Sequence, residues 1–160
     1  MAKFSESYLG QLREVIGNRL VLMPGCRIVI EGGAGQILLQ QRADFGLWGL
    51  PGGSAEPGES IESVITREVA EETGLQVSNV RPFGYASNPA YETWTYPNGH
   101  QCQFFSLMFH TQAFSGELAA LDGESLQLGW FPPHELHRCS RTCGALLRRL
   151  CASRSRVSFR

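Results

Sequence analysis

Three glutamates, Glu68, Glu71 and Glu72, lie within five consecutive residues of a segment that also predicts a helix. At positions i, i+3 and i+4 their side chains project from one face of an α-helix. Like charges at this spacing repel by roughly 0.2–0.5 kcal/mol per pair, so the helix gains no stability from them. A hard divalent cation such as Mg²⁺ or Mn²⁺ prefers oxygen ligands and would remove this repulsion. A solvated acidic helix is the alternative explanation.

The flanking residues predict how this helix is held. Gly52 and Gly53 let the backbone approach a ligand closely, Ser60 is a favourable N-cap, and Gly74 is a favourable C-terminal residue, so we expect a helix over residues 61–73. Apolar residues spaced by four form a stripe along it: Ile61, Ile65 and Val69. The stripe borders the glutamate face, so we expect the carboxylates at the edge of a packed interior, where burial makes an unpaired charge costly.

The segment from residue 53 to residue 75 resembles the signature of the Nudix hydrolase family, G-x5-E-x7-R-E-U-x-E-E-x-G-U, in which U is aliphatic. It matches every specified position: Gly53, Glu59, Arg67, Glu68, Val69, Glu71, Glu72, Gly74 and Leu75. The preceding residues 48–53, WGLPGG, resemble the approach strand of that family. The resemblance extends from about Cys26 to Leu136. It implies a Nudix-type α/β/α sandwich with a mixed β-sheet.

The resemblance also implies an activity. Members of the family hydrolyse a pyrophosphate bond in a nucleoside diphosphate linked to another moiety, such as ADP-ribose, a nucleotide sugar or a dinucleoside polyphosphate, using Mg²⁺ or Mn²⁺. Two alternatives remain open: a (d)NTP pyrophosphohydrolase for damaged nucleotides, and a non-catalytic nucleotide-sensing module. Sensing modules typically lose the carboxylates that this chain keeps. Pro89 and Tyr91 fall fourteen and sixteen residues beyond Leu75, slightly off the spacings typical of two substrate subclasses, so the sequence does not select the substrate.

Site roles follow from positions in the signature. The resemblance implies metal ligands from three carboxylates and one backbone carbonyl: Glu68, Glu71, Glu72 and Gly52. Glu71 is alternatively the general base. Arg67 is expected to orient a glutamate through a charge-assisted hydrogen bond rather than to contact substrate, and Glu59 and Gly53 are expected to support the box.

Enzymes of this family often take their general base from a loop glutamate outside the box. Glu117 and Glu124 are the two candidates, and each is alternatively a solvated loop acid. We favour Glu117 because it follows a long predicted strand and because Gly116 permits a sharp turn toward the active face.

Further residues are candidates for substrate binding. Arg42 could clamp a phosphate in a bidentate manner or pair with the neighbouring Asp44. Trp94, Tyr91 and Tyr96 could stack on a nucleobase or simply pack.

Periodicity and turn residues predict an α/β, more exactly α+β, chain. We expect an N-terminal amphipathic helix within residues 1–17, with Tyr8, Leu9, Leu12, Val15 and Ile16 on one face, and a final helix over residues 142–151 within a basic segment, 140–160. The predicted strands cover residues 20–23, 26–31, 36–42, 77–87, 91–96, 101–114 and 127–131. Hairpins are expected at residues 32–35 and 97–99.

Composition indicates a single domain over residues 1–160. The chain has a formal net charge of −1, 42% hydrophobic residues and no apolar run long enough to cross a bilayer. We therefore expect a cytoplasmic enzyme with a small-molecule nucleotide substrate, no membrane association and no strong case for nucleic acid; a homodimer is left open. The five cysteines lack a CxxC pair. A zinc site of Cys139 and Cys143 with His134 and His137 is therefore disfavoured against reduced thiols.

Overall fold

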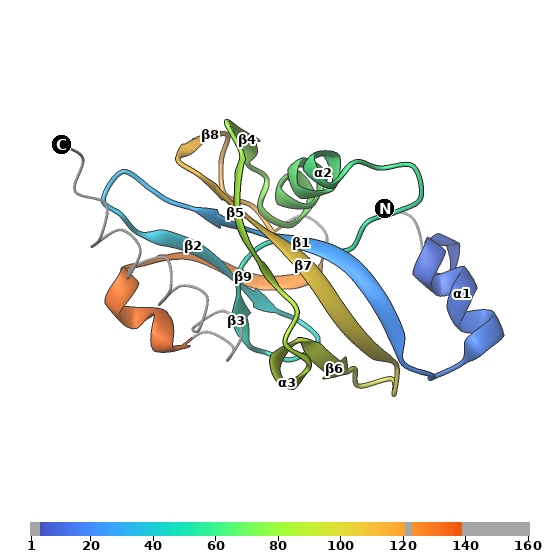
Figure 1. Ribbon diagram of the computed structural model, residues 1–160. Coiled ribbons are helices and arrows are strands. Elements are labelled where there is room, and N and C mark those ends of the chain that lie inside the picture. The colour runs from blue at the N-terminus through green and yellow to red at the C-terminus, as the bar shows by residue number, and fades with distance from the viewer. Residues whose placement is uncertain (1–3, 121–122, 139–160) are drawn as a thin grey trace.

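The computed structural model describes residues 4–120 and 123–138 of the chain. The strands are β1 (Val21–Ile30), β2 (Ile37–Arg42), β3 (Trp48–Gly49), β4 (Gln76–Ser78), β5 (Arg81–Ala86), β6 (Thr93–Thr95), β7 (Gln101–Thr111), β8 (Ala113–Ser115) and β9 (Ser125–Phe131). The helices are η1 (Phe4–Glu6), α1 (Tyr8–Ile16), α2 (Ile61–Thr73), α3 (Pro89–Glu92) and η2 (Pro133–Arg138). Helices and strands therefore alternate irregularly along the chain (Figure 1).

Strand β7 organises the larger sheet. It pairs in parallel with β1 and antiparallel with β5 and β6. A second sheet has the order β3-β2-β9, in which both pairings are antiparallel, and β4 pairs with β8 in a small ladder. Parallel and antiparallel pairs thus occur together, which confirms the predicted α+β class with a mixed sheet.

Alternation along the strands divides the core into two clusters. Ile28 and Ile30 of β1 and Phe109 of β7 pack with the buried side chains of α2, whereas Val29 and Met108, one position along, pack on the opposite face. Figure 1 shows α2 above the sheets and the orange turns of η2 below them. The sheets therefore lie between helical elements, as expected of a sandwich.

Helix α2 has the predicted limits, Ile61–Thr73. Ser60 caps it, since the Ser60 hydroxyl accepts a hydrogen bond from the Ser63 N–H at 3.2 Å, and Gly74 ends it in the left-handed region at φ 74°. Its buried apolar residues are Val64, Ile65 and Val69. The expected stripe is thus largely correct, with Val64 added and Ile61 only partly buried.

Several strand boundaries differ from the predictions, and local geometry gives the reasons. The predicted strands 20–23 and 26–31 form one strand, β1, because its pairing with β7 continues without a break through Pro24. The predicted strand 77–87 is divided where Asn79 adopts φ 50°. The predicted strand 91–96 begins instead with α3, because the Asn88 side chain accepts from the Ala90 N–H and Pro89 occupies the first turn.

The two predicted hairpins have different outcomes. The turn at 97–99 joins β6 to β7 as an antiparallel pair, with Gly99 at φ 83°. The turn at 32–35 forms, but β1 and β2 then diverge into separate sheets and share only the Glu31–Ile37 bridge. The predicted strand 101–114 ends at Thr111, whose hydroxyl accepts from the Ala113 N–H at 3.0 Å before β8 begins.

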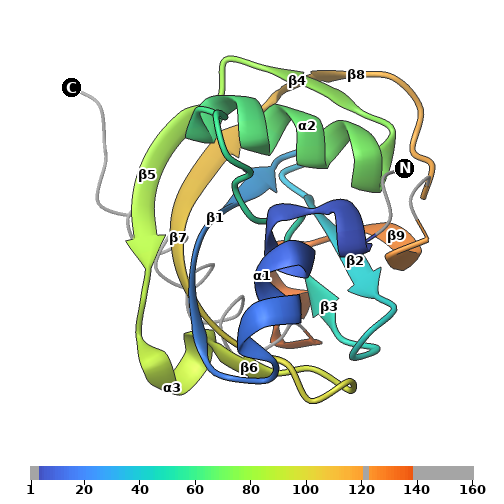
Figure 2. The same cartoon turned by 90° about the vertical axis from the view of Figure 1, so that its right-hand side faces the viewer.

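The N-terminal helix is shorter than predicted, and its expected apolar face is only partly buried, at Leu9, Leu12 and Ile16. Tyr8 and Val15 are 49% and 85% exposed, whereas Arg13 is buried. Figure 2 shows α1 in front of the strands, on the side of the molecule that lies to the right in Figure 1. The predicted helix 142–151, the basic segment, and Cys139 and Cys143 lie outside the described residues. Within the described part of the chain, Cys26 and Cys102 are buried free thiols, and no helix is both long and apolar enough to cross a membrane.

Candidate active site

Glu72 is a buried carboxylate near the C-terminal end of α2. Its side-chain oxygen Oε2 accepts a hydrogen bond from the Gly52 N–H at 2.8 Å, and the residue is only 2% exposed. Burial raises the pKa of Glu72 to about 8, and the negative charge of Glu68 adds to the rise, whereas the Gly52 hydrogen bond and the Arg42 charge oppose it. Burial disfavours the charged form of Glu72, so a cation bound beside the carboxylate would stabilise it.

The loop before the box fixes Gly52 opposite Glu72. The carbonyls of Pro51 and Gly53 accept hydrogen bonds from β1, from the Ile28 N–H at 3.0 Å and the Cys26 N–H at 2.9 Å. Between these two anchors the Gly52 N–H turns away from β1 and points to the Glu72 carboxylate on α2. Gly52 has φ 146°, and a Cβ there would collide with the Cys26 carbonyl. Only glycine fits this close approach.

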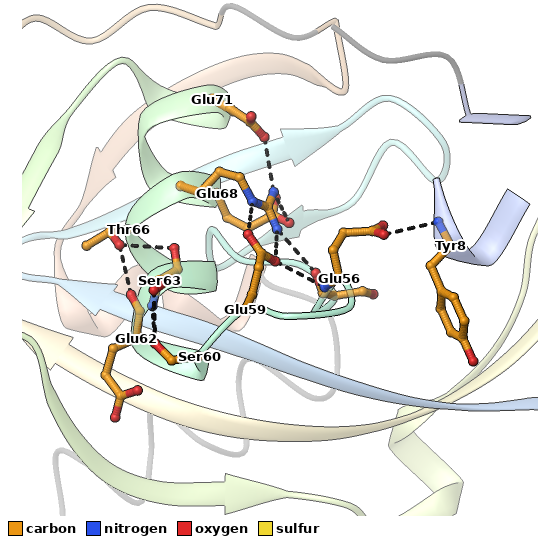
Figure 3. Close-up of polar contacts among 11 residues, drawn as sticks. Tyr8, Glu56, Glu59, Ser60, Glu62, Ser63, Thr66, Glu68 and Glu71 are labelled. Carbon is orange, nitrogen blue, oxygen red and sulfur yellow. Dashed lines mark hydrogen bonds and ion pairs between the residues drawn. The ribbon is translucent and has the colours of Figure 1, made fainter. Parts of the chain in front are cut away.

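Arg67 connects the carboxylates of the box. It makes a bidentate contact with Glu59 at 2.8 and 2.9 Å, and its Nη1 donates to both Glu68 and Glu71 at 2.9 and 3.2 Å (Figure 3). The Arg67 contact lowers the pKa of Glu59, and the same bond raises the pKa of Arg67. Arg67 therefore has the geometry of an orienting group, directed at glutamates on both sides.

Glu68 lies between this arginine and the glycine loop. A Cβ on Gly53 would overlap the Glu68 carboxylate, so the absence of a side chain at Gly53 makes room for it. Burial raises the pKa of Glu68; the charge and hydrogen bond of Arg67 oppose the rise, and Glu71 and Glu124 add to it. Two of the predicted ligands thus carry charges that burial disfavours.

The donor set fits a hard divalent cation. It consists of carboxylate oxygens on one helix face with a glycine backbone segment beside them, and oxygen is the donor that Mg²⁺ and Mn²⁺ prefer. Among residues 4–120 and 123–138, no three His, Cys, Asp or Glu side chains converge as a ready-made site. The reason is local: the Glu71 side chain is 55% exposed and turned toward Arg67, and one expected donor is the Gly52 carbonyl rather than a side chain.

The two loop acids occupy different places. Glu117 lies at the C-terminal end of α2, where its carbonyl packs against Gly74. Glu124 lies beside the box, since its charge contributes to the raised pKa of Glu68. Its carbonyl also accepts from the Ala43 N–H at 2.8 Å, which ties this loop to the end of β2. The structure therefore gives Glu124 an electrostatic effect on the carboxylate cluster, and it places the backbone of Glu117 at the end of α2.

Arg42 pairs with the neighbouring Asp44, which was one of the two arrangements expected for it. It makes a bidentate ion pair with Asp44 at 3.0 and 2.6 Å, yet it remains close enough to Glu72 to affect the pKa of that carboxyl. Burial raises the pKa of the adjacent Tyr96 to about 12, and the Arg42 charge opposes that rise. Arg42 therefore lies between the box and a group of aromatic side chains.

That aromatic group consists of Phe45, Trp94 and Tyr96. The Phe45 ring centroid lies 5.0 Å from Trp94 and 5.3 Å from Tyr96, with tilted planes. Tyr91, the other predicted stacking residue, lies on α3 and is 43% exposed. Sequence reasoning missed Phe45, which no periodicity distinguishes; only its position two residues before Leu47-Trp48 in the loop between β2 and β3 hinted at an apolar role.

Two other polar groups near the site were also missed. Arg27 on β1 makes a bidentate contact with Glu92 at 3.1 and 2.9 Å, and Glu92 is 1% exposed. The buried Gln40 on β2 accepts from the Ser125 hydroxyl; its Nε2 has no partner of hydrogen-bond geometry in the described residues, although the amide lies near enough to lower the pKa of Glu72. The Arg27–Glu92 pair and Gln40 reach the site through contacts between segments far apart in the sequence, so no local pattern reveals them.

Comparisons with known proteins agree with this architecture. The family model for the NUDIX domain matches residues 21–149. The chain is 34% identical over 113 residues to a putative 8-oxo-dGTP diphosphatase of Bacillus subtilis, covering 70% of this chain and 68% of that protein. It is also 34% identical over 113 residues to the NAD-capped RNA hydrolase NudC of Pasteurella multocida, of which it spans only 38%.

Among solved structures, the MutT NUDIX hydrolase of Burkholderia pseudomallei superposes with a TM-score of 0.68 at 26% identity, over 81% of this chain and 98% of that one. The family match exceeds half of the chain and includes the whole carboxylate cluster and the loop that faces it. The chain therefore belongs to the NUDIX family and is a Nudix hydrolase.

Proposed function

We propose that this enzyme hydrolyses a pyrophosphate bond of a nucleotide with the help of Mg²⁺ or Mn²⁺. The observation that carries the proposal is that Glu72 accepts from the Gly52 N–H while Glu68 lies against Gly53, with both carboxyl pKa values raised by burial. Glu68, Glu72 and the Gly52 carbonyl would hold the cation, with Glu71 as a further ligand. When bound, the cation neutralises phosphate charge and makes water more acidic.

The remaining residues of the box keep that arrangement in place. The bidentate Glu59–Arg67 pair directs the Arg67 Nη1 toward Glu68 and Glu71, which limits the positions that both carboxylates can take. We assign the general base to Glu124, which would accept a proton from the attacking water. Its support is that its charge is close enough to Glu68 to raise the pKa of that carboxyl.

We place the nucleobase against Phe45, Trp94 and Tyr96. Tilted rings about 5 Å apart leave π faces and edges on which a base can stack. Arg42 lies between these rings and Glu72, so its guanidinium would contact a phosphate after exchanging the Asp44 carboxylate for a phosphate oxygen.

For the substrate we now place the (d)NTP alternative first. Its support is the similarity to the 8-oxo-dGTP diphosphatase, which is matched over 68% of its length. A nucleoside diphosphate linked to another moiety, the leading expectation from the sequence alone, is second; the NudC similarity favours it, over a minor part of that protein. The retained Glu59, Glu68, Glu71 and Glu72 argue against a sensing module.

A product assay with Mg²⁺ or Mn²⁺ separates these classes. Incubation with 8-oxo-dGTP, unmodified dNTPs, ADP-ribose, a nucleotide sugar, a dinucleoside tetraphosphate and NADH is followed by chromatography. The proposal expects a nucleoside monophosphate and pyrophosphate from a triphosphate, and no products with Glu72→Gln. Two monophosphates from ADP-ribose or NADH at higher kcat/KM would move the second class to first place. No product from any compound would contradict the function.

The other proposals rest on the sequence. They are one domain over residues 1–160, a cytoplasmic location, a small nucleotide as partner, and a homodimer as the open question of assembly. Gel filtration with light scattering tests the last of these.

A further inference from the structure

The segment before β1 lies outside the family match, which begins at residue 21. It nevertheless contacts two parts of the site that are far apart in sequence: the loop of the box and the hairpin that carries the aromatic side chains. Figure 1 shows α1 beside the loop that leads into α2, near the end of β1.

The contact with the box passes through Glu56. The Glu56 carboxylate accepts a hydrogen bond from the Tyr8 backbone N–H at 3.0 Å, at the first position of α1 (Figure 3). The Glu56 N–H in turn donates to Glu59 at 3.0 Å, and Glu59 holds Arg67. A hydrogen-bonded chain thus runs from the N-terminus of α1 to the arginine that orients Glu68.

The helix end suits this contact. The four N–H groups at the start of a helix have no partners within it, and the helix dipole favours a carboxylate there. Ser7 satisfies one of them, since its hydroxyl accepts from the Gly10 N–H at 3.0 Å, and Glu56 satisfies another. Gly10 has no side chain, which lets η1 fold back over the helix, because a Cβ there would collide with the Phe4 carbonyl.

The contact with the hairpin passes through the buried Arg13. Its Nη2 donates to the Gln101 carbonyl at 2.6 Å, at the start of β7, and Nη1 donates to the Gly17 carbonyl at 2.9 Å. The Phe4 ring also stacks on His100 with centroids 5.8 Å apart. Because Arg13 is buried and makes several hydrogen bonds, α1 has a fixed position from which it can hold Glu56.

We propose that Glu56 is a positioning residue of the metal-binding box, held by the N-terminus of α1, and that α1 thereby links the box to the hairpin that binds the base. Neither Glu56 nor the first helix touches the reacting atoms. The proposal rests on the proposed function in that the carboxylates it positions are those assigned to Mg²⁺ or Mn²⁺.

The chain offers a precise variant for the test. Tyr8 is the first residue of α1, where proline is well tolerated, and Ser7 already has the extended conformation, φ −69° and ψ 159°, that a following proline requires. Tyr8→Pro therefore removes two things: the N–H that donates to Glu56, and the tyrosine ring. Tyr8→Ala removes the ring and keeps the N–H, so it is the matched control.

The readout is Mn²⁺ affinity, measured by the loss of the free Mn²⁺ electron paramagnetic resonance signal during titration. Tyr8→Pro and Glu56→Ala are each expected to weaken Mn²⁺ binding by about two- to fivefold, the range for one exposed charge contact at a helix end. The double variant should bind Mn²⁺ no more weakly than either single variant. Tyr8→Ala is expected to match the wild type. Glu56→Gln keeps an oxygen acceptor without changing α1 and should recover most of the affinity that Glu56→Ala loses.

Wild-type Mn²⁺ affinity in Tyr8→Pro, or equal losses in Tyr8→Pro and Tyr8→Ala, would overturn the proposal. A loss above about a hundredfold in Glu56→Ala alone would also overturn it, because Glu56 would then act as a ligand. If Tyr8→Pro does not fold, the Glu56→Ala and Glu56→Gln pair decides in its place. Turnover does not enter this measurement, so an enzyme inactive on every nucleotide would contradict the proposed function and leave this comparison valid.

Discussion

At the scale of single residues, the general base was the assignment that the sequence could least resolve. Glu117 and Glu124 both lie in loops, and loop acids have no periodicity that reveals where they point. Gly116 does adopt φ 98°, as a sharp turn requires, but that turn packs Glu117 against Gly74 at the end of α2. Glu124 instead lies near Glu68, because β9 pairs with β2 and carries its preceding loop to the box.

The corresponding prediction compares two variants. Glu124→Gln should lower kcat by about a hundredfold or more, the usual scale for a lost general base, and should remove the acidic limb of the kcat–pH profile. Glu117→Gln, the matched control, should stay within about threefold of wild type. The reverse pattern would restore Glu117, and small losses in both variants would move the role to Glu71.

At the scale of elements, α2 was predictable because its signals are local. Ser60, Gly74 and the apolar spacing fall within fifteen residues, and the structure reproduces the predicted limits. The box residues were predictable for the same reason. Phe45, Gln40 and the Arg27–Glu92 pair were not, because strand register and loop packing bring them to the site from separate segments. The strand 91–96 failed because the Asn88 cap and Pro89 favour a helical turn over the alternating pattern.

The glycine loop facing α2 gives the element-scale prediction. The atoms nearest to a Cβ on Gly53 belong to the Glu68 side chain, whereas those nearest to a Cβ on Gly52 belong to the backbone of β1. Gly53→Ala should therefore displace a ligand and lower kcat by at least about tenfold, with little change in the melting temperature in chelator. Gly52→Ala should lower the melting temperature itself, because a side chain at φ 146° costs roughly 1–3 kcal/mol of folding free energy in strain. Equal thermal losses in both variants would contradict this division.

At the scale of the whole molecule, the buried carboxylates make stability depend on pH when no cation is present. The folded-state pKa of Glu72 is raised from 4.5 to about 8, so the folded protein binds this proton more tightly than the unfolded chain does. The resulting stabilisation is fully present below about pH 4.5 and is lost as the pH rises through 8. Raised pKa values at Glu68 act in the same direction.

In chelator, the free energy of unfolding of the wild type should therefore fall from pH 5 to pH 8 relative to that of Glu72→Gln, which has no charge to bury. Urea titrations of both proteins at several pH values measure this difference, and the common contributions of other groups cancel. Parallel curves would mean that Glu72 is not held in a site that disfavours its charge.

The central claim is that the α2 carboxylates bind a cation that the reaction requires, and Glu72→Gln tests it most directly. The substitution nearly preserves shape while removing a charged oxygen donor. The account predicts that kcat, measured at saturating Mg²⁺ on the best substrate of the wild type, falls by at least about a hundredfold while the circular dichroism spectrum is unchanged. A kcat within threefold of the wild-type value would contradict it.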